Sequence, residues 1–510
     1  MWHHIFHGDQ EGTEHEVATR AFSKYKEFLF QGPEAKVPAL TATRLREVAL
    51  GSQPTAAGVD GWSPADFKLL PLCAFETLVD ILNIAEGGGG WPDDLCRGRT
   101  ALLAKGPRAE WDLTQFRVLL LLPQLYRLWG RIRDKDLEAW SRGWDHPALC
   151  AGLGGRGAED AWFGVNLELE EAKLTGCPAT LATLDLTKAF DTCIRQFLYL
   201  GLLMAGCPRQ VLVAYASFHA RLQVCHVIRG VAGLWHHRPR SIPQGCPLSM
   251  RLCAFILLPI VRITEAGKAI PRLLADDILL RGAGAEGLDE VDDAVGAAVN
   301  FLEDSGARVS YDKSFMLATE ACQRRQARRR QAAKGDKGLK VVLTLRDLGA
   351  SLSTHRGRSH GIIKDRHDAA RQDAKKIVLM HPPVDKVIGL VRGKVWPKAL
   401  YGVETGDAPR DHARPLQSAI ADAIIGRSGQ MRQAELTLVV AGGRPHVLRG
   451  RGGVAAAHHD AQAGRQVAGS QGHGHVVLQG LLRGWWGQPC SAGACRVPAA
   501  VAGEPWLQGP

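Results

Sequence analysis

Short apolar runs and longer stretches with helical spacing alternate along most of the chain. A run of alternating or continuous apolar residues bounded by turn residues predicts a strand, and apolar positions three and four apart predict a helix. The expected strands are residues 99–104, 116–122, 180–185, 273–280 as a hairpin, and 339–353 as two strands around a turn. The expected helices are residues 64–70, 124–140, 158–174, 195–206, 248–266, 288–304 and most of 361–430. This mixture predicts the α+β class.

The predicted hairpin at residues 273–280, LLADDILL, places two adjacent carboxylates, Asp276 and Asp277, inside an apolar run. Burying carboxylates is costly unless a positive group compensates them. Two interpretations are open. The pair lies at an exposed hairpin tip, where Asp is common because it bonds the backbone locally, or it holds a cation. The pattern of this segment alone does not choose between them.

Net charge, cysteine usage and the N-terminal sequence indicate the kind of binding partner and the cellular compartment. The formal net charge is +11 and the pI is near 9.1, which favours a polyanion, nucleic acid first. The twelve cysteines are scattered without a C-x-x-C pair, so we expect neither a disulfide framework nor a zinc knuckle. The N-terminus lacks a signal-peptide pattern and the apolar run at 252–261 is too short to span a membrane. We expect an intracellular protein, in the nucleus or cytoplasm.

Three further segments carry weaker signals. GLGGRG at 152–157 matches a dinucleotide fingerprint in letters, but no strand precedes it, so a glycine-rich loop before a helix is favoured. QRRQARRRQAAKGDKG at 323–338 reads as a charged loop, suited to phosphate contact, to solvation or to an import signal. After Lys398 the chain has no lysine and its end is rich in Gly, Ala, Arg and His. That composition is typical of disorder or of GC-rich coding sequence read out of frame.

Three acidic or turn motifs follow one another in a specific order. LDLTKAFD at 184–191 ends an apolar strand with Asp185, IPQGCPLS follows at 242–249, and LADD at 274–277 completes the set. In this order and spacing the chain resembles a reverse transcriptase of the type found in retrotransposons without long terminal repeats. The resemblance extends over about residues 54–406, including GVDGWSP and GLGGRGAEDA upstream and DKS and ALYGVETG downstream. It is specific in the three motifs and looser elsewhere.

The resemblance implies a right-hand polymerase with fingers, a palm containing an antiparallel sheet, and a helical thumb. The implied parts are a helical N-terminal extension at 1–53, fingers at 54–170, palm at 171–350, a thumb-like helical region at 351–430 and a disordered or frameshifted tail at 431–510. Residues Leu274 and Val118 depart from the family, which usually has an aromatic residue and a proline at these positions.

The acids have an independent chemical rationale. Joining a nucleotide to a primer requires in-line attack on a phosphate, and two Mg²⁺ ions about 3.5–4 Å apart stabilise the attacking and leaving oxygens. Mg²⁺ prefers hard oxygen ligands, with one or two carboxylates beside phosphate oxygens. We therefore expect Asp185, Asp276 and Asp277 to be catalytic residues and ligands of two Mg²⁺ ions, with Mn²⁺ as a substitute.

The resemblance assigns further roles. Lys105 and Arg117 would grip the triphosphate, and Lys313 would protonate the leaving pyrophosphate. Phe190 would select deoxynucleotides, and Gln244 with Gly245 would line the incoming nucleotide and template. Each has an ordinary alternative, because isolated Lys and Arg residues are commonly solvated and an isolated Phe commonly packs in a core. Asp191 is expected to be structural, as a helix cap.

The predicted function is RNA-directed DNA polymerase of a retroelement, acting on an RNA template, a DNA or RNA primer and dNTPs. Two alternatives are open: a catalytically decayed palm that binds RNA, and an RNA-directed RNA polymerase. The last is disfavoured because Ala275 stands before the paired acids where such enzymes usually have Gly, and because Phe190 suits deoxynucleotides. The oligomeric state is not predicted.

Overall fold

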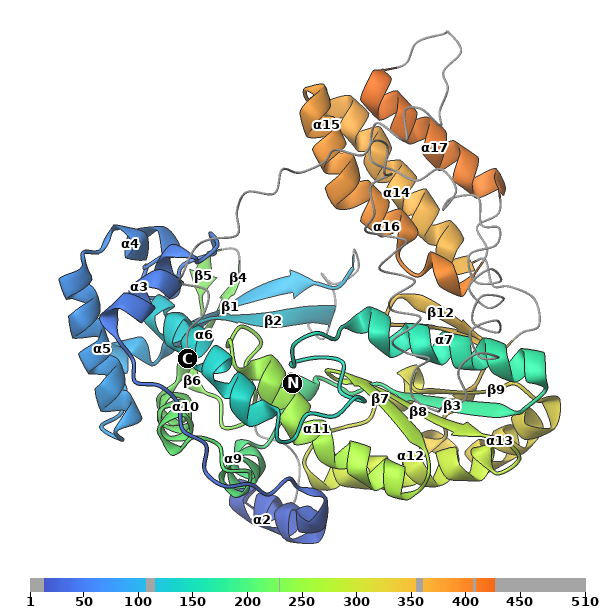
Figure 1. Ribbon diagram of the computed structural model, residues 1–510, viewed down its shortest axis with the longest axis horizontal. Coiled ribbons are helices and arrows are strands. Elements are labelled where there is room, and N and C mark those ends of the chain that lie inside the picture. Colours follow the sequence, from blue (N-terminus) through green and yellow to red (C-terminus); the bar gives the residue numbers. More distant parts are fainter. Residues whose placement is uncertain (1–12, 107–114, 229, 355–360, 407–409, 427–510) are drawn as a thin grey trace, which may run out of the picture.

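A computed structural model of the chain describes residues 13–106, 115–228, 230–354, 361–406 and 410–426. Two mixed regions of helix and strand lie side by side, and a group of helices rises above one of them (Figure 1). Most strand pairs of the central sheet are antiparallel and helices pack on the sheet, which is consistent with the α+β prediction. The predicted tail at 431–510 lies outside the described residues.

The central sheet has five strands in the order β10-β9-β3-β8-β7. Its strands are β3 (Ala179–Leu184), β7 (Ile270–Leu274), β8 (Asp277–Ala283), β9 (Phe315–Ala318) and β10 (Lys340–Val341). β3 is antiparallel to both β8 and β9, and every residue of β3 is buried. Its two threonines, Thr180 and Thr183, are buried with its alanines and leucines.

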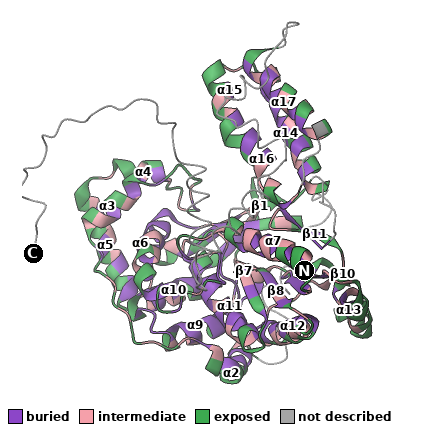
Figure 2. Ribbon diagram, turned by 45° about the vertical axis from the view of Figure 1, so that its right-hand side comes forward, coloured by how far each residue is buried: buried purple, intermediate pink, exposed green. Residues whose placement is uncertain are grey.

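Successive side chains of these strands point to opposite faces of the sheet. Leu181, Leu279 and Leu317 pack with helix α7 (Ala158–Thr175) and with the hairpin of β11 (Thr344–Asp347) and β12 (Ala350–Ser353). Ala182, Leu280 and Met316 pack on the other face with helices α11 (Ser249–Ala266) and α12 (Gly287–Asp304). We call these the α7 face and the α12 face. Buried residues concentrate where these layers meet (Figure 2).

The second region joins another five-stranded sheet to a group of helices. Strand β1 (Arg97–Ala104) pairs antiparallel with β2 (Phe116–Leu121) and parallel with β4 (Gln223–Ile228). The short strands β5 (Val231–Ala232) and β6 (His236–His237) pair with β4. The helices are α3 (Ala42–Leu50), α4 (Pro64–Leu69), α5 (Leu72–Glu86), α6 (Gln124–Ser141), α9 (Arg195–Met204) and α10 (Arg209–Arg221). Ser63 precedes α4 and its side chain closes a capping box with Asp66, at the start of the helix predicted over 64–70.

A buried ionic cluster fixes this region. Arg133 on α6 donates to both carboxylate oxygens of Glu86 on α5, at 2.7 and 2.6 Å, and Trp129 donates to one of them at 2.7 Å. Arg133 also donates to Asp136 at 2.8 Å, and Arg44 from α3 pairs with the same Asp136. The Arg133 and Glu86 side chains are 0% and 7% exposed. Fork-shaped arginine–carboxylate bonding of this kind adds both energy and orientation.

The N-terminal helix α2 (Glu14–Tyr25) docks against the central sheet's supporting helices. Tyr25 and Lys24 both donate to Asp304 at the end of α12, each at 2.7 Å, and Arg240 bonds Glu14 at 2.8 Å. Val17, Ala18 and Ala21 are buried in the same core as α9 and α12. The N-terminal extension is therefore part of the folded body.

The upper helices have their own apolar core. They are α14 (Gly361–Met380), α15 (Val384–Leu390), the π-helical segment η7 (Val391–Val395), α16 (Trp396–Leu400) and α17 (Arg410–Ile425). They meet the body at the β11–β12 hairpin and α7 (Figure 1). No helix in the described part of the chain is long and apolar enough to cross a membrane. All ten cysteines in the described residues are free thiols.

One secondary-structure prediction is wrong. The segment expected as a charged loop at 323–338 begins within helix α13 (Ala321–Ala333). Arginine and glutamine are good helix formers, so a dense charge run does not oppose a helix. Its inward positions are two glutamines and an alanine, which give no apolar periodicity in the sequence.

Candidate active site

The β7–β8 hairpin brings the two adjacent aspartates to the edge of the central sheet. Leu274 pairs with Asp277, so Ala275 and Asp276 form a two-residue turn, and Ala275 has a φ of +53°. On the neighbouring strand, Leu184 pairs with Ile278. Asp185 therefore follows β3 at the same edge as Asp277. By strand alternation both belong to the α7 face.

The three carboxylates are electrostatically coupled. Burial raises the pKa of Asp277 to about 7, assisted by the negative charges of Asp276, Asp347 and Asp185. The pKa of Asp276 is raised by burial and by Asp185, and burial also raises the pKa of Asp185. Desolvation and like charge both disfavour the ionised form. The fold therefore opposes the ionised form of all three carboxylates at this edge.

Three of the predicted cations act on these acids. Lys313 and Lys105 both oppose the rise in the pKa of Asp185, and Lys105 and Arg117 do so for Asp276. Lys105 follows strand β1, while Arg117 lies on β2 opposite Leu103. Lys313 lies in the short helix η5 (Tyr311–Lys313) before β9. All three side chains are exposed and accessible to a ligand at this edge.

Two hydrogen bonds connect the backbone of strand β2 to the segments that contain Lys188 and Gln244. Lys188, in the loop after Asp185, donates its ammonium to the carbonyl of Phe116 at 2.7 Å. The amide of Leu120 donates to the carbonyl of Gln244 at 2.7 Å. Gly245 has a φ of +127°, and a Cβ there would lie 2.2 Å from the carbonyl oxygen of Leu120. The structure thus explains why glycine follows Gln244: both the dihedral and the close approach exclude a side chain.

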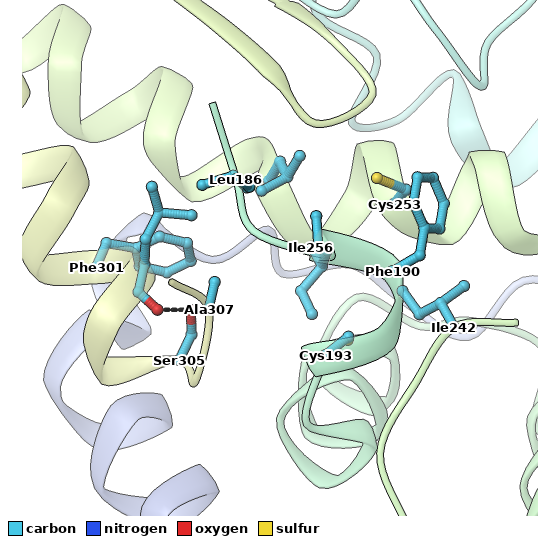
Figure 3. A pocket seen from close by; sticks show the side chains of 12 residues that line it. Leu186, Phe190, Cys193, Ile242, Cys253, Ile256, Phe301, Ser305 and Ala307 are labelled. Carbon is cyan, nitrogen blue, oxygen red and sulfur yellow. Dashed lines mark hydrogen bonds between the residues drawn. The ribbon is translucent and has the colours of Figure 1, made fainter. Parts of the chain in front are cut away.

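Phe190 lies on the one-turn helix α8 (Ala189–Thr192) and lines an apolar pocket with Cys253, Ile256 and Ile242 (Figure 3). The pocket is close to the acids, since Asp276 is one of the charges that raise the pKa of Cys253. Phe190 is half-buried and packs against the core. The core packing agrees with the ordinary alternative for Phe190, and deoxynucleotide selection stays a prediction.

Asp191 is structural, but the predicted helix cap is wrong. Asp191 lies inside α8, where Lys188 occupies the cap position. Its carboxylate accepts a 2.8 Å bond from Arg238, and the two side chains are 4% and 2% exposed. The pairing partner is 47 residues away in the chain, so no local pattern announced it.

Sequence reasoning missed Asp347, which ends β11. Burial raises the pKa of Asp347 to about 6, and its charge acts on Asp277. The turn that follows it is held from the upper helices: Tyr401 donates to the carbonyl of Leu348 at 2.9 Å, and Arg366 to that of Gly349 at 2.8 Å. Trp162 on α7 donates to the Tyr401 hydroxyl at 3.2 Å. In the sequence Asp347 is an acid before a Leu-Gly turn, a position with no distinguishing signal.

The acids fit a hard divalent cation in donor chemistry but do not form a closed ligand set. Within the described residues, no group of three or more His, Cys, Asp or Glu side chains is arranged to hold a metal ion. Carboxylate oxygens are the donors that Mg²⁺ prefers, and Mg²⁺ usually takes one or two of them with substrate phosphates. The edge is therefore suited to an ion that arrives with a phosphate ligand.

Comparison with known proteins identifies the segment that carries this edge. No curated protein matches the chain. Residues 105–335 match the family model of the reverse transcriptase (RNA-dependent DNA polymerase). The match begins at Lys105, includes all three aspartates and ends just past α13. The segment that carries the acidic edge is thus similar to reverse transcriptases.

Proposed function

We propose that the chain is an RNA-directed DNA polymerase of a retroelement, of the type without long terminal repeats. The observation that carries the proposal is the edge where Asp185, Asp276 and Asp277 meet under the influence of Lys105 and Arg117, within a segment similar to reverse transcriptases. The raised pKa values favour the same conclusion, because perturbed carboxylates are more frequent at functional sites.

Each charged residue then has a chemical task. The three aspartates bind the divalent ions, which supply Lewis acidity to the phosphate and activate the primer hydroxyl. Lys105 and Arg117 bind the triphosphate oxygens and hold the nucleotide against the acids. Lys313 lies next to Asp185 and delivers a proton to the departing pyrophosphate. Gln244, bonded to β2, and Gly245 beside it form the floor under the base pair.

Phe190 is proposed to select the sugar. Its ring lies beside Cys253, near Asp276, at a position where a ribose 2′-hydroxyl would meet an apolar wall (Figure 3). An RNA template, a DNA or RNA primer and dNTPs follow as substrates. The second candidate, an RNA-binding protein without catalysis, is favoured by one observation: the acids are not arranged as a metal site.

Primer extension on an RNA template tests the proposal. The full chain is given a DNA primer, dNTPs and Mg²⁺, beside an Asp276→Asn variant and an rNTP reaction. The matched control is Asp80→Asn, an exposed aspartate on α5. We expect DNA synthesis by the parent and the control and none by Asp276→Asn. Preference for rNTPs would favour an RNA polymerase. Template binding without synthesis by the folded parent would favour the non-catalytic candidate.

A further inference from the structure

Helix α13 lies on the outer side of the central sheet, against β9 and β10 and beside α12 (Figure 1). Polar side chains anchor it. Gln323 donates to the carbonyl of Gly284 at 3.1 Å, and Gln331 donates to Asp292 at 2.7 Å and accepts from the amide of Leu339 at 3.0 Å. Ala327 between them is fully buried. Because Gln323, Ala327 and Gln331 are four residues apart, they define one inward stripe.

The arginines of α13 fall into two classes. Arg324 donates to the carbonyls of Ala318 and Thr319, at 2.8 and 2.6 Å, and Arg330 pairs with Asp289 at 2.6 Å. Arg325, Arg328 and Arg329 are exposed, and none forms an ion pair or hydrogen bond with another described residue. Arg324 and Arg330 are therefore bonded within the fold, whereas Arg325, Arg328 and Arg329 are free to bind a ligand.

The three outward arginines lie on one side of the helix. Residues three and four apart are neighbours on a helix, and like charges at this spacing destabilise it. Arg325 has Arg328 and Arg329 at these two spacings, so the repulsion is not avoided. On an ordinary solvated helix face, acidic residues lie between the basic ones. Acidic residues of α12 provide such partners for Arg330 and Lys334, but none does so for the three outward arginines. A row of guanidinium groups suits a polyphosphate, since arginine binds phosphate oxygens bidentately.

Helix α13, which carries the three outward arginines, lies on the opposite face of the central sheet from Asp185 and Asp277. Thr180 bonds Gln323 at 3.4 Å, and Thr180 belongs with Ala182 to the α12 face. Asp185 and Asp277 belong to the opposite, α7 face by strand alternation. A primer–template held at the acids would not contact α13. Any nucleic acid on α13 is a different segment from the one being copied.

We propose that the outward face of α13, Arg325, Arg328 and Arg329, is a second RNA-binding surface that contacts the phosphate backbone of RNA extending beyond the copied segment. The contact is sequence-independent, because it involves phosphates and no base edges. Its identification as RNA rests on the proposed function, whereas the surface itself rests on the helix geometry. The net charge of +11 makes such long-range attraction favourable.

Two probes separate the surface from the active site. One is a short primer–template duplex, and the other is the same duplex carrying a long single-stranded RNA arm. Full-length protein with Arg325, Arg328 and Arg329 changed to Gln is compared with the parent in salt titrations of binding. The control removes the same charge from dispersed exposed arginines, Arg20→Gln, Arg46→Gln and Arg142→Gln.

The α13 triple variant is expected to bind the armed probe more weakly, with the slope of log K against log salt shallower by about 2, since each lost single-strand phosphate contact removes about 0.7. Binding and extension of the short duplex are expected to be unchanged. Thermal stability should rise, because the like-charge repulsion is relieved. A merely structural helix would lose stability instead.

Three outcomes would overturn the proposal. They are an arm that adds no affinity, an equal loss in the dispersed control, or unchanged RNA binding with lost binding to a nuclear import receptor. The result is independent of catalysis. If the parent fails to extend primers but only the α13 variant loses arm-dependent binding, the surface stands and the polymerase proposal fails.

Discussion

Carboxylates gather in two regions of the molecule, buried in one and partly exposed in the other, and their surroundings are opposite. On helices α5 and α6, Glu86 and Asp136 are each bonded to arginine, with Arg133 shared between them. At the edge of the central sheet, Asp276, Asp277 and Asp347 form no ion pair with any described residue and repel one another. The fold itself thus provides Glu86 and Asp136 with positively charged partners, and among the described residues it provides no ion-pair partner for the second group.

The difference separates charge kept for stability from charge kept for binding. A buried ion pair that is broken on one side leaves an unpaired charge and destabilises the fold. An unpaired acidic edge already carries that cost, so removing one of its charges should relieve the fold while removing a ligand. Stability and activity should therefore respond in opposite directions in the two regions.

The largest expected effect is on activity. If the proposed function holds, Asp185→Asn removes a metal ligand worth several kcal/mol of transition-state stabilisation and should lower primer extension by about a thousandfold or more. Its free energy of unfolding should not fall, since burial disfavours the charged form of Asp185. Extension rates and urea denaturation of the same preparation test both parts. A variant that unfolds more easily would break the comparison.

The next largest effect is on stability. Glu86→Ala should lower the free energy of unfolding by about 3–5 kcal/mol, because Arg133 and Trp129 lose a buried acceptor. Urea denaturation measures the change, with Glu76→Ala, an exposed glutamate on the same helix, as the control. A loss below about 1 kcal/mol would mean that the buried cluster contributes no more than a surface pair.

The pH dependence gives a third, smaller effect. The pKa of Asp277 is raised from 3.8 to about 7, so the folded protein binds this proton more tightly than the unfolded chain. The stabilisation is fully present below about pH 4 and is lost as pH rises through about 7. Asp277→Asn should therefore stabilise the metal-free protein more at about pH 8 than at about pH 5. Equal gains at the two pH values would contradict the raised pKa.

The smallest effect concerns the turn that presents the acids. Ala275 has a left-handed φ of +53°, which costs a residue with a Cβ about 1 kcal/mol. Ala275→Gly should raise the free energy of unfolding by up to about 1 kcal/mol. Ala369→Gly, at an exposed position inside α14, should lower it by a similar amount. Changes of the same sign at both sites would show that the turn carries no strain.

The sequence predicted those features that depend on neighbouring residues. The alternation and apolar runs placed β3, the β7–β8 hairpin and the helices around them, and the motif order placed Asp185 beside Asp277. It did not predict features that depend on distant partners. Arg238 reaches Asp191 across 47 residues, Asp347 comes to the acids through a separate hairpin, and α13 is anchored by glutamines that leave no apolar periodicity.

The docking of α2 shows that the folded unit begins before the segment matched by the family model. The recognisable domain starts at Lys105, yet Tyr25 and Glu14 bond residues inside it and Val17 is buried in its core. A fragment trimmed to the recognisable boundaries would expose that apolar surface to water. The smallest fragment expected to fold on its own is therefore longer than the segment that the family comparison detects. It would have to include helix α2.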